Sequence, residues 1–195
     1  MTNYDAKTAL LVVDVQNDFA DPSGSLHVPS GEEVIPVIND EIRKARAAGA
    51  LVVYTQDWHP EATPHFEKDG GIWPVHCVGG SWGARFHPDL LIEGPAVKKG
   101  IGGEDGYSGF SIRDPQSGEE RSTGLTALLR GRGVTRTVIV GLALDYCVKA
   151  TALDAQREGL AATVLASATR AVNLEQGDDE RALADLEKAG VEVVA

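Results

Sequence analysis

The chain has 195 residues, of which 43% are hydrophobic and 24% are charged, and its formal net charge at pH 7 is −11. This length and composition predict a globular protein with a sizeable core. The negative charge argues against nucleic acid or an anionic membrane as a partner, since either needs a basic patch, and no run approaches the roughly 18 apolar residues of a membrane span.

The cysteines and the N-terminal residues indicate the cellular compartment of the protein. Cys77 and Cys147 form no CxxC motif and no disulfide framework, which suits a reducing environment, so we predict a cytoplasmic protein. The N-terminus lacks a basic region followed by an apolar one, so no signal peptide is expected. The sequence leaves open whether the chain forms a homo-oligomer.

The first predicted strand is Thr8–Val13, an apolar run without helical periodicity, as in a buried parallel strand. Asp14 follows it directly and so lies at the carboxyl edge of the sheet, where open α/β sheets bind ligands. A turn-forming aspartate is the alternative. The loop that follows, over residues 18–31, makes a functional acid at least as good an interpretation.

A helix that ends at Gly49 is predicted next, with Ser30 and Glu33 as a capping box. Because Pro36 is best placed in a first turn, the regular helix can start as late as Glu33 to Ile35. A second buried strand is predicted over Ala50–Tyr54. The segment from Asp57 to Pro95 then has no sustained periodicity but is rich in histidine and aromatic residues. A loop this long is usually functional or disordered, and its aromatic content argues against disorder. We therefore predict one domain over residues 1–195 with a metal-binding insertion at about 57–95.

Four residues of this insertion are candidate metal ligands. Asp57 and His59 are two apart, so in an extended segment their side chains point the same way, and His65 and His76 can fold back toward them. One carboxylate and up to three imidazoles suit Zn²⁺, Fe²⁺ or Mn²⁺ with positions left open. Each residue alone would more often bind nothing, but the four together predict one divalent transition metal.

The third predicted strand, Ala96–Lys99, ends on two lysines. Adjacent strand residues point to opposite faces, so only one of Lys98 and Lys99 can face a site at the sheet edge. Lys99 is nearer the carboxyl edge, and Gly100 lets the chain turn away directly after it. These positions favour Lys99.

After a short helix over Leu125–Gly131, a β-branched strand over Thr137–Val140 leads through Gly141 toward Cys147. Asp145 is predicted to cap a helix that ends at Gly159, which places Cys147 in its first turn. Free N–H groups and the helix dipole favour a thiolate there. On position alone, a small buried hydrophobe is an equally good interpretation of this cysteine.

The last elements are a strand over Ala161–Leu165, an amphipathic helix over Gly177–Ala189 and a strand over Val191–Val194. Six strands that alternate with helices predict an α/β fold, in three αβα layers, with a six-stranded, mainly parallel, Rossmann-like sheet.

In this fold Asp14, a lysine of the third strand and Cys147 would reach the same edge of the sheet. Together they supply a nucleophile, a cation that stabilises a thiolate and an acid that carries protons, which is the chemistry of covalent acyl transfer. The backbone N–H groups of Ala143 and Cys147 are candidates for an oxyanion hole.

These residues lie in motifs that resemble the nicotinamidase (pyrazinamidase) family of isochorismatase-like cysteine hydrolases. The resemblance runs from Leu10 to the C-terminus. Its motifs are VVDVQNDF (residues 12–19), the Asp57, His59 and His65 set, WPVHCV (73–78), Lys99-Gly100, YSGF (107–110) and GLALDYCV (141–148).

The resemblance implies a role for each of these residues. Asp14 would be the general acid and base, Lys99 the third member of a triad and Cys147 the nucleophile. Asp57, His59 and His76 would be the common metal ligands, and His65 a fourth ligand found in a subset of the family. The pyridine ring would lie against Phe19, Trp73 and Tyr107, and the Leu142–Ala143 peptide would be cis.

The implied activity is hydrolysis of the small molecule nicotinamide, and of pyrazinamide, to the acid and ammonia, in salvage of pyridine nucleotides. The residues alone predict only a metal-containing cysteine amidase. Two alternatives stay open: a relative that acts on carbamoyl or ureido amides, which usually lacks the metal cluster, and a non-enzymatic interaction domain of the same fold. The metal cluster counts against the first and the intact triad against the second.

Overall fold

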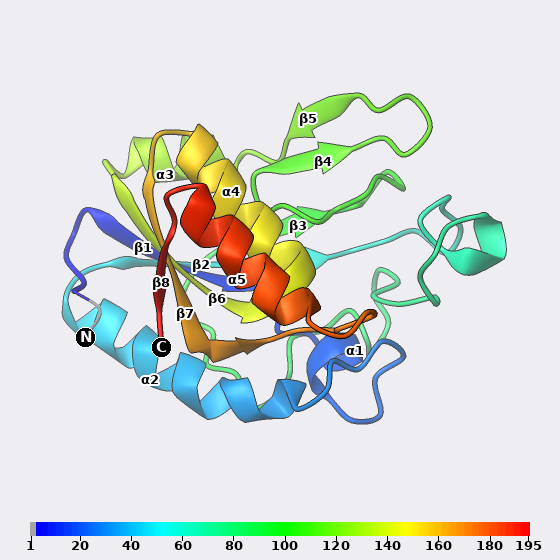
Figure 1. The fold of residues 1–195 in the computed structure, drawn as a ribbon, viewed down its shortest axis with the longest axis horizontal. Coiled ribbons are helices and arrows are strands. Elements are labelled where there is room, and N and C mark those ends of the chain that lie inside the picture. Colours follow the sequence, from blue (N-terminus) through cyan, green and yellow to red (C-terminus); the bar gives the residue numbers. More distant parts are fainter. Residues whose placement is uncertain (1–2) are drawn as a thin grey trace.

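The computed structural model describes residues 3–195, and its centre is a six-stranded sheet in the order β3-β2-β1-β6-β7-β8 (Figure 1). Every neighbouring pair of strands is parallel, which confirms the predicted α/β sheet. The strands are β1 (Thr8–Val13), β2 (Leu51–Asp57), β3 (Ala96–Lys99), β6 (Arg136–Leu142), β7 (Ala161–Arg170) and β8 (Glu192–Val194).

Helices cover both faces of this sheet, so the three predicted layers are present. On one face, Leu10 and Val12 of β1 pack in a buried cluster with α2 (Val34–Ala47). The alternate residues Ala9 and Leu11 pack on the other face. The helices of that second cluster are α3 (Leu125–Gly131), α4 (Lys149–Arg157) and α5 (Asp178–Lys188).

The order of the strands determines where a ligand can bind. From β1 the chain adds β2 and β3 on one side and later adds β6, β7 and β8 on the other, so the strand order reverses between β1 and β6. Such a reversal opens a crevice at the carboxyl ends of the strands. Asp14 directly follows β1 at this crevice, and the segment that carries Cys147 directly follows β6.

Glycine is needed where β6 passes the end of β1. Gly141 has φ of +114°, and a Cβ there would lie 2.1 Å from the carbonyl oxygen of Val13. A residue with a Cβ would clash with the backbone of Val13 and push the two strand ends apart.

Several details differ from the sequence-based expectations. Ser30 does not cap a helix: it adopts a left-handed conformation with φ of +56°, and a 3-10 turn follows it over Gly31–Glu33. The helix α2 begins at Val34, within the range that Pro36 predicts. Both β2 and β7 extend beyond the apolar runs that predicted them. The structure adds α1 (Asn17–Ala20) and an antiparallel hairpin of β4 (Ser111–Arg113) and β5 (Glu120–Ser122), whose polar residues carry no strand signal.

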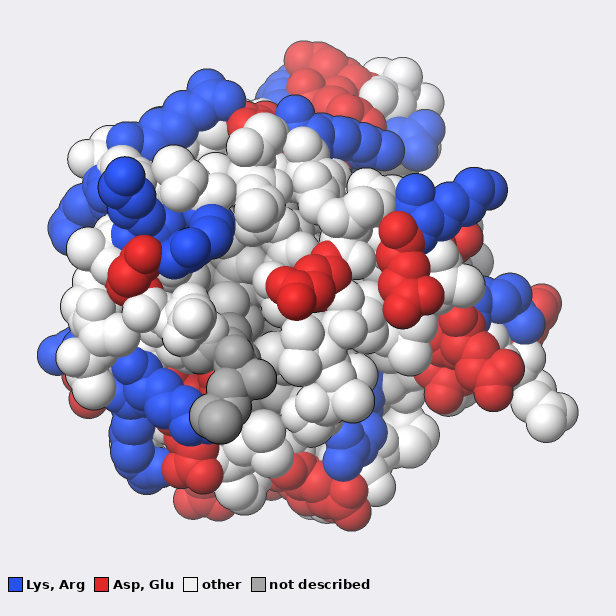
Figure 2. All heavy atoms as spheres, turned by 60° about the vertical axis from the view of Figure 1, so that its left-hand side comes forward, with Lys and Arg blue, Asp and Glu red and all other residues white. Residues whose placement is uncertain are grey.

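Two further features concern the surface. Within residues 3–195, none of the helices combines the length and the apolar character that crossing a bilayer requires. Figure 2 shows basic and acidic side chains interspersed among the described residues on one face of the molecule.

Candidate active site

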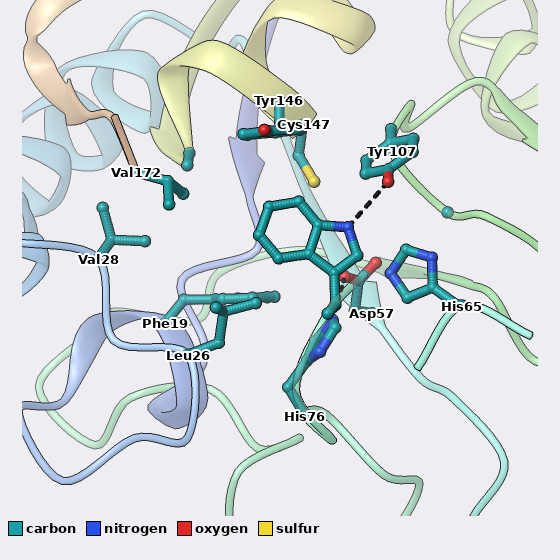
Figure 3. Close-up of a pocket in the computed structure, with 13 residues that line it drawn as sticks. Phe19, Leu26, Val28, Asp57, His65, His76, Tyr107, Tyr146, Cys147 and Val172 are labelled. Atoms are coloured by element: carbon teal, nitrogen blue, oxygen red, sulfur yellow. Dashed lines mark hydrogen bonds and ion pairs between the residues drawn. The ribbon is translucent and has the colours of Figure 1, made fainter. Parts of the chain in front are cut away.

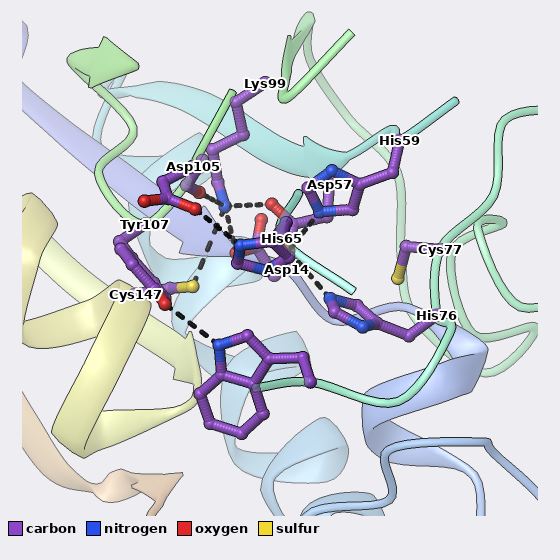
Figure 4. Close-up of polar contacts among 12 residues, drawn as sticks. Asp14, Asp57, His59, His65, His76, Cys77, Lys99, Asp105, Tyr107 and Cys147 are labelled. Carbon is purple, nitrogen blue, oxygen red and sulfur yellow. Dashed lines mark hydrogen bonds and ion pairs between the residues drawn. The ribbon is translucent and has the colours of Figure 1, made fainter. Parts of the chain in front are cut away.

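Three buried side chains meet at the crevice: Asp14, Lys99 and Cys147, which follow or end β1, β3 and β6 (Figure 4). The Nζ atom of Lys99 lies 2.7 Å from Oδ2 of Asp14 and 3.7 Å from Sγ of Cys147. The structure therefore brings together the three residues that the sequence selected. Their catalytic roles stay predictions.

The two adjacent lysines have different environments, as their strand positions predict. Lys99 is 1% exposed and also donates to Oδ1 of Asp57 and to the carbonyl oxygen of Gly106. The exposed Lys98 instead places its Nζ 3.3 Å from the centre of the Trp58 ring, a cation–π contact. Only Lys99 faces Cys147.

The ammonium of Lys99 and the carboxyl of Asp14 share one buried environment. Burial raises the pKa of Asp14 to about 6, against the lowering effect of Lys99. Burial by itself would lower the pKa of Lys99, but the carboxylates of Asp14 and Asp57 raise it well above its usual value. Near neutral pH, Lys99 is therefore a fixed cation, whereas Asp14 can take up or release a proton.

Asp14 has one further partner that sequence reasoning missed. Thr55 of β2 is fully buried, and its Oγ1 donates to Oδ1 of Asp14 at 2.6 Å. This hydrogen bond favours the charged carboxylate and so lowers its pKa. A buried threonine inside an apolar strand gives no local signal of such a role.

The predicted thiolate at Cys147 is wrong for the resting site. Cys147 is buried, and burial raises its pKa well above the usual value although Lys99 lowers it. The residue lies in a π-helical turn, Leu144–Val148, and not in the first turn of a capped α-helix. Asp145 does not cap this turn, because its carboxylate accepts the N–H groups of Val172 and Asn173. The resting cysteine is a thiol and needs a base to take its proton.

The segment before Cys147 has the backbone form that the resemblance implied, since the Leu142–Ala143 peptide is cis. Ala143 and Cys147 both line the pocket. Their assignment as the oxyanion hole stays a prediction.

The histidine cluster of the insertion lies beside the triad. His59, His65 and His76 are buried and each offers a ring nitrogen within 4.8 Å of the others. Oδ2 of Asp57 lies 3.7 Å from Nε2 of His59 and 3.9 Å from Nε2 of His76. The structure therefore groups the three histidines, with the carboxylate of Asp57 beside His59 and His76 (Figure 4).

The chemistry of these four residues fits a divalent metal ion. Within residues 3–195, neither ring nitrogen of the buried His59 has a hydrogen-bond partner, a costly arrangement unless a ligand binds there. Burial lowers the pKa of His76 to about 4, so its ring is neutral. Burial by itself would raise the pKa of Asp57, but Lys99 and His59 lower it, so this residue is a carboxylate. Neutral imidazoles and a carboxylate are the forms that bind Zn²⁺ and similar ions.

A pocket opens between the triad and the histidine cluster (Figure 3). All three residues predicted to contact a ring line it: Phe19, Trp73 and Tyr107. Trp73 donates its indole N–H to the hydroxyl of Tyr107 at 2.9 Å, and its ring meets Tyr146 edge-on with centroids 4.8 Å apart. The walls are therefore aromatic, which suits a small flat molecule.

Sequence reasoning missed part of this lining: Leu26, Val28, Tyr146 and Val172. Tyr146 could have been found from its place next to Cys147. Leu26 and Val28 lie in a loop without periodicity, and Val172 reaches the pocket because β7 extends to Arg170.

Several known proteins are similar to this chain along most of its length. The Isochorismatase domain model matches residues 8–195. The nicotinamidase/pyrazinamidase of Mycobacterium tuberculosis is 41% identical over 192 residues, which cover 95% of this chain and 97% of that protein. The pyrazinamidase of Pyrococcus horikoshii, solved in complex with zinc, is 41% identical with a TM-score of 0.86 and covers 96% of this chain and 98% of its own. PnC1 from L. infantum, solved in complex with nicotinate, is 36% identical with a TM-score of 0.88 and covers 99% and 95%.

Proposed function

The chain belongs to the isochorismatase family, and from this premise we propose that its site hydrolyses nicotinamide to nicotinate and ammonia through a thioester on Cys147. The observation that carries the proposal is the contact of Lys99 with both Asp14 and Cys147, beside an aromatic pocket and a histidine cluster. Nicotinamide presents what these parts recognise: a flat ring, a ring nitrogen and a carboxamide.

In the first half of the reaction Asp14 is the base. Its carboxylate takes the proton of the Cys147 thiol as Sγ bonds to the carboxamide carbon. The N–H groups of Ala143 and Cys147 stabilise the oxyanion, and Lys99 stabilises the negative charge that passes between Asp14 and the sulfur. Asp14 then gives its proton to the leaving nitrogen, so ammonia departs and a thioester remains.

In the second half a water molecule replaces the sulfur. Asp14 takes one proton from the water as its oxygen attacks the thioester carbon, and it returns that proton to Sγ when the C–S bond breaks. Nicotinate leaves and the enzyme regains its thiol. The raised pKa of Asp14, about 6, allows it to give and take a proton near neutral pH.

We propose that Asp57, His59, His65 and His76 hold one divalent transition metal, either Zn²⁺, Fe²⁺ or Mn²⁺. When bound, the metal supplies a Lewis acid for the pyridine nitrogen of the substrate. Phe19, Trp73 and Tyr107 flank the ring. We further propose a single domain that acts in the cytoplasm in the salvage of pyridine nucleotides.

An ammonia-release assay tests the proposed activity against its alternatives. The purified protein should release ammonia from nicotinamide and pyrazinamide and not from carbamoyl or ureido amides. Release from the ureido amides alone would assign the chain to another amidase class. No release from any amide, by protein with the metal bound, would favour a non-enzymatic interaction domain.

Removal of the metal should weaken substrate binding. After treatment with a chelator we expect loss of about one metal ion per chain and a KM at least about tenfold higher, restored by added Zn²⁺. Metal analysis and steady-state kinetics measure both. An active preparation without bound metal would contradict this prediction.

The individual ligands should differ in their effects. His76→Ala should lower metal content and raise KM more than His65→Ala, because His65 is the ligand that the resemblance assigns to only a subset of the family. Equal losses in the two variants would contradict this ranking.

The pH dependence should follow Asp14. As pH falls through about 6 the carboxylate becomes protonated and can no longer accept the thiol proton, so kcat/KM should fall. Thr55→Val removes a hydrogen bond that favours the charged form, so this acid limb should move to higher pH. Thr137→Val is the control. Thr137 is a buried threonine on strand β6, and its hydroxyl donates a hydrogen bond to the carbonyl oxygen of Ala161. An acid limb that does not move in Thr55→Val would argue against Asp14 as the base.

A further inference from the structure

The three histidines of the metal cluster are held in different ways. The Nδ1 of His76 lies 2.7 Å from the carbonyl oxygen of Pro74, a backbone contact two residues away. Neither ring nitrogen of His59 has a hydrogen-bond partner among the described residues. The Nδ1 of His65 lies 2.7 Å from Oδ1 of Asp105, a side chain 40 residues later in the chain. Of these three histidines, His65 is the one with a carboxylate at hydrogen-bonding distance, since Oδ2 of Asp57 lies 3.7 Å from Nε2 of His59 and 3.9 Å from Nε2 of His76.

Asp105 is itself fixed by the backbone. Its N–H donates to the carbonyl oxygen of Arg113 at 2.7 Å, and the N–H of Arg113 donates back at 3.0 Å. This bridge ties residue 105 to β4, the first strand of the hairpin. The carboxylate that contacts His65 therefore stands on an ordered support and not on a free loop tip.

A carboxylate can only accept a hydrogen bond, so the contact places the proton of His65 on Nδ1. The lone pair of Nε2 is then free to bind a metal ion. The His65 ring stacks on His59 with centroids 4.8 Å apart and lies 5.5 Å from the ring of His76. The ring thus already lies among the other candidate ligands.

We propose that Asp105 is a positioning residue that fixes the tautomer and orientation of His65 and so makes this histidine the fourth protein ligand of the metal. The inference rests on the proposed metal site, but not on the identity of the substrate. Asp105 does not line the substrate pocket, and its side chain contacts His65, so its effect on the metal is expected to pass through this histidine.

The two residues after Asp105 limit which substitutions can test this. The carbonyl oxygen of Gly106 accepts a hydrogen bond from the ammonium of Lys99, and the hydroxyl of Tyr107 accepts one from the indole N–H of Trp73. A change that moved this backbone would disturb the triad and the pocket together. Asp105→Asn and Asp105→Ala alter only the side chain and keep the backbone bridge to Arg113. Glu104→Gln is the matched control, since it removes one negative charge from the neighbouring residue and keeps an acceptor for Gly102.

The experiment measures transfer of zinc from the loaded protein to a competing chromophoric chelator. Asp105→Ala should weaken zinc binding about tenfold, and no more than His65→Ala does. Asp105→Asn, whose amide oxygen can still accept from Nδ1, should lose less. Glu104→Gln should bind zinc like the wild type.

A double-mutant cycle separates positioning from general damage. In a His65→Ala background, Asp105→Ala should cost no further zinc affinity, because the histidine through which it acts is gone. An equal loss of zinc affinity in both backgrounds, or wild-type affinity in Asp105→Ala, would overturn the inference. If the wild-type protein binds no zinc, both the proposed metal site and the role of Asp105 are wrong. If the protein binds zinc but does not release ammonia from nicotinamide, only the proposed substrate is wrong.

Discussion

Replacing Cys147 with alanine should abolish the release of ammonia from nicotinamide, with kcat lower by about four orders of magnitude or more. The reason is that the other cysteine, Cys77, does not line the pocket: it is buried, and its backbone N–H donates to Oδ2 of Asp18. The small change in side-chain volume should leave the fold and the metal content intact. Ammonia release, circular dichroism and metal analysis measure the three quantities.

Cys77→Ala is the matched control, because it removes the second buried cysteine and leaves the triad untouched. It should keep its activity. Wild-type protein quenched during turnover should carry an acyl group on the peptide that contains Cys147, detected by mass spectrometry. Turnover by Cys147→Ala above a trace, or an acyl group on Cys77, would rule out the thioester mechanism proposed for Cys147.

Replacing Lys99 with alanine should lower kcat/KM by orders of magnitude and also destabilise the protein. The substitution leaves the carboxylates of Asp14 and Asp57 buried without their shared cation, and removal of one partner from a buried pair typically costs about 3–5 kcal/mol. Loss of the cation also favours protonated Asp14, so the acid limb of the pH profile should move to higher pH. Urea unfolding and pH-dependent kinetics measure these effects, and Lys99→Met keeps the volume of the side-chain stem.

Lys98→Ala provides the control next to it in the sequence. Lys98 is exposed, and its ammonium lies over the ring of Trp58, a contact worth about 0.5–1 kcal/mol at an exposed site. Its loss should leave kcat/KM close to the wild-type value. An inactive Lys98→Ala with an active Lys99→Ala would mean that strand β3 is shifted by one residue in its pairing with β2.

The residues that were predicted best from the sequence are those at or directly after the ends of strands. Asp14, Lys99 and Asp57 end or directly follow parallel strands, and parallel strands present their carboxyl ends at one edge. The same rule explains the choice of Lys99 over Lys98, since side chains alternate along a strand. Local periodicity and topology were enough for these positions.

Contacts between distant segments could not be predicted in the same way. Asp105 meets His65 across 40 residues, and Thr55 meets Asp14 across 41, with no pattern in either segment that points to the other. The protonation of Cys147 was predicted wrongly because position at a helix start says nothing of burial, and here burial outweighs the nearby cation. The extent of a pocket likewise depends on how loops fold over the sheet.

The triad and the pocket walls come from different kinds of segment, and this separation bears on how such enzymes diverge. Asp14 and Lys99 stand at or directly after strand ends, and Cys147 lies in the π-helical turn that follows β6. Phe19, Trp73 and Tyr107 belong instead to α1 and to the segments between strands. Connecting segments tolerate substitution and changes of length far better than sheet strands do. Descendants of one ancestor can therefore acquire new amide substrates by altering the walls while the acyl-transfer machinery is inherited unchanged.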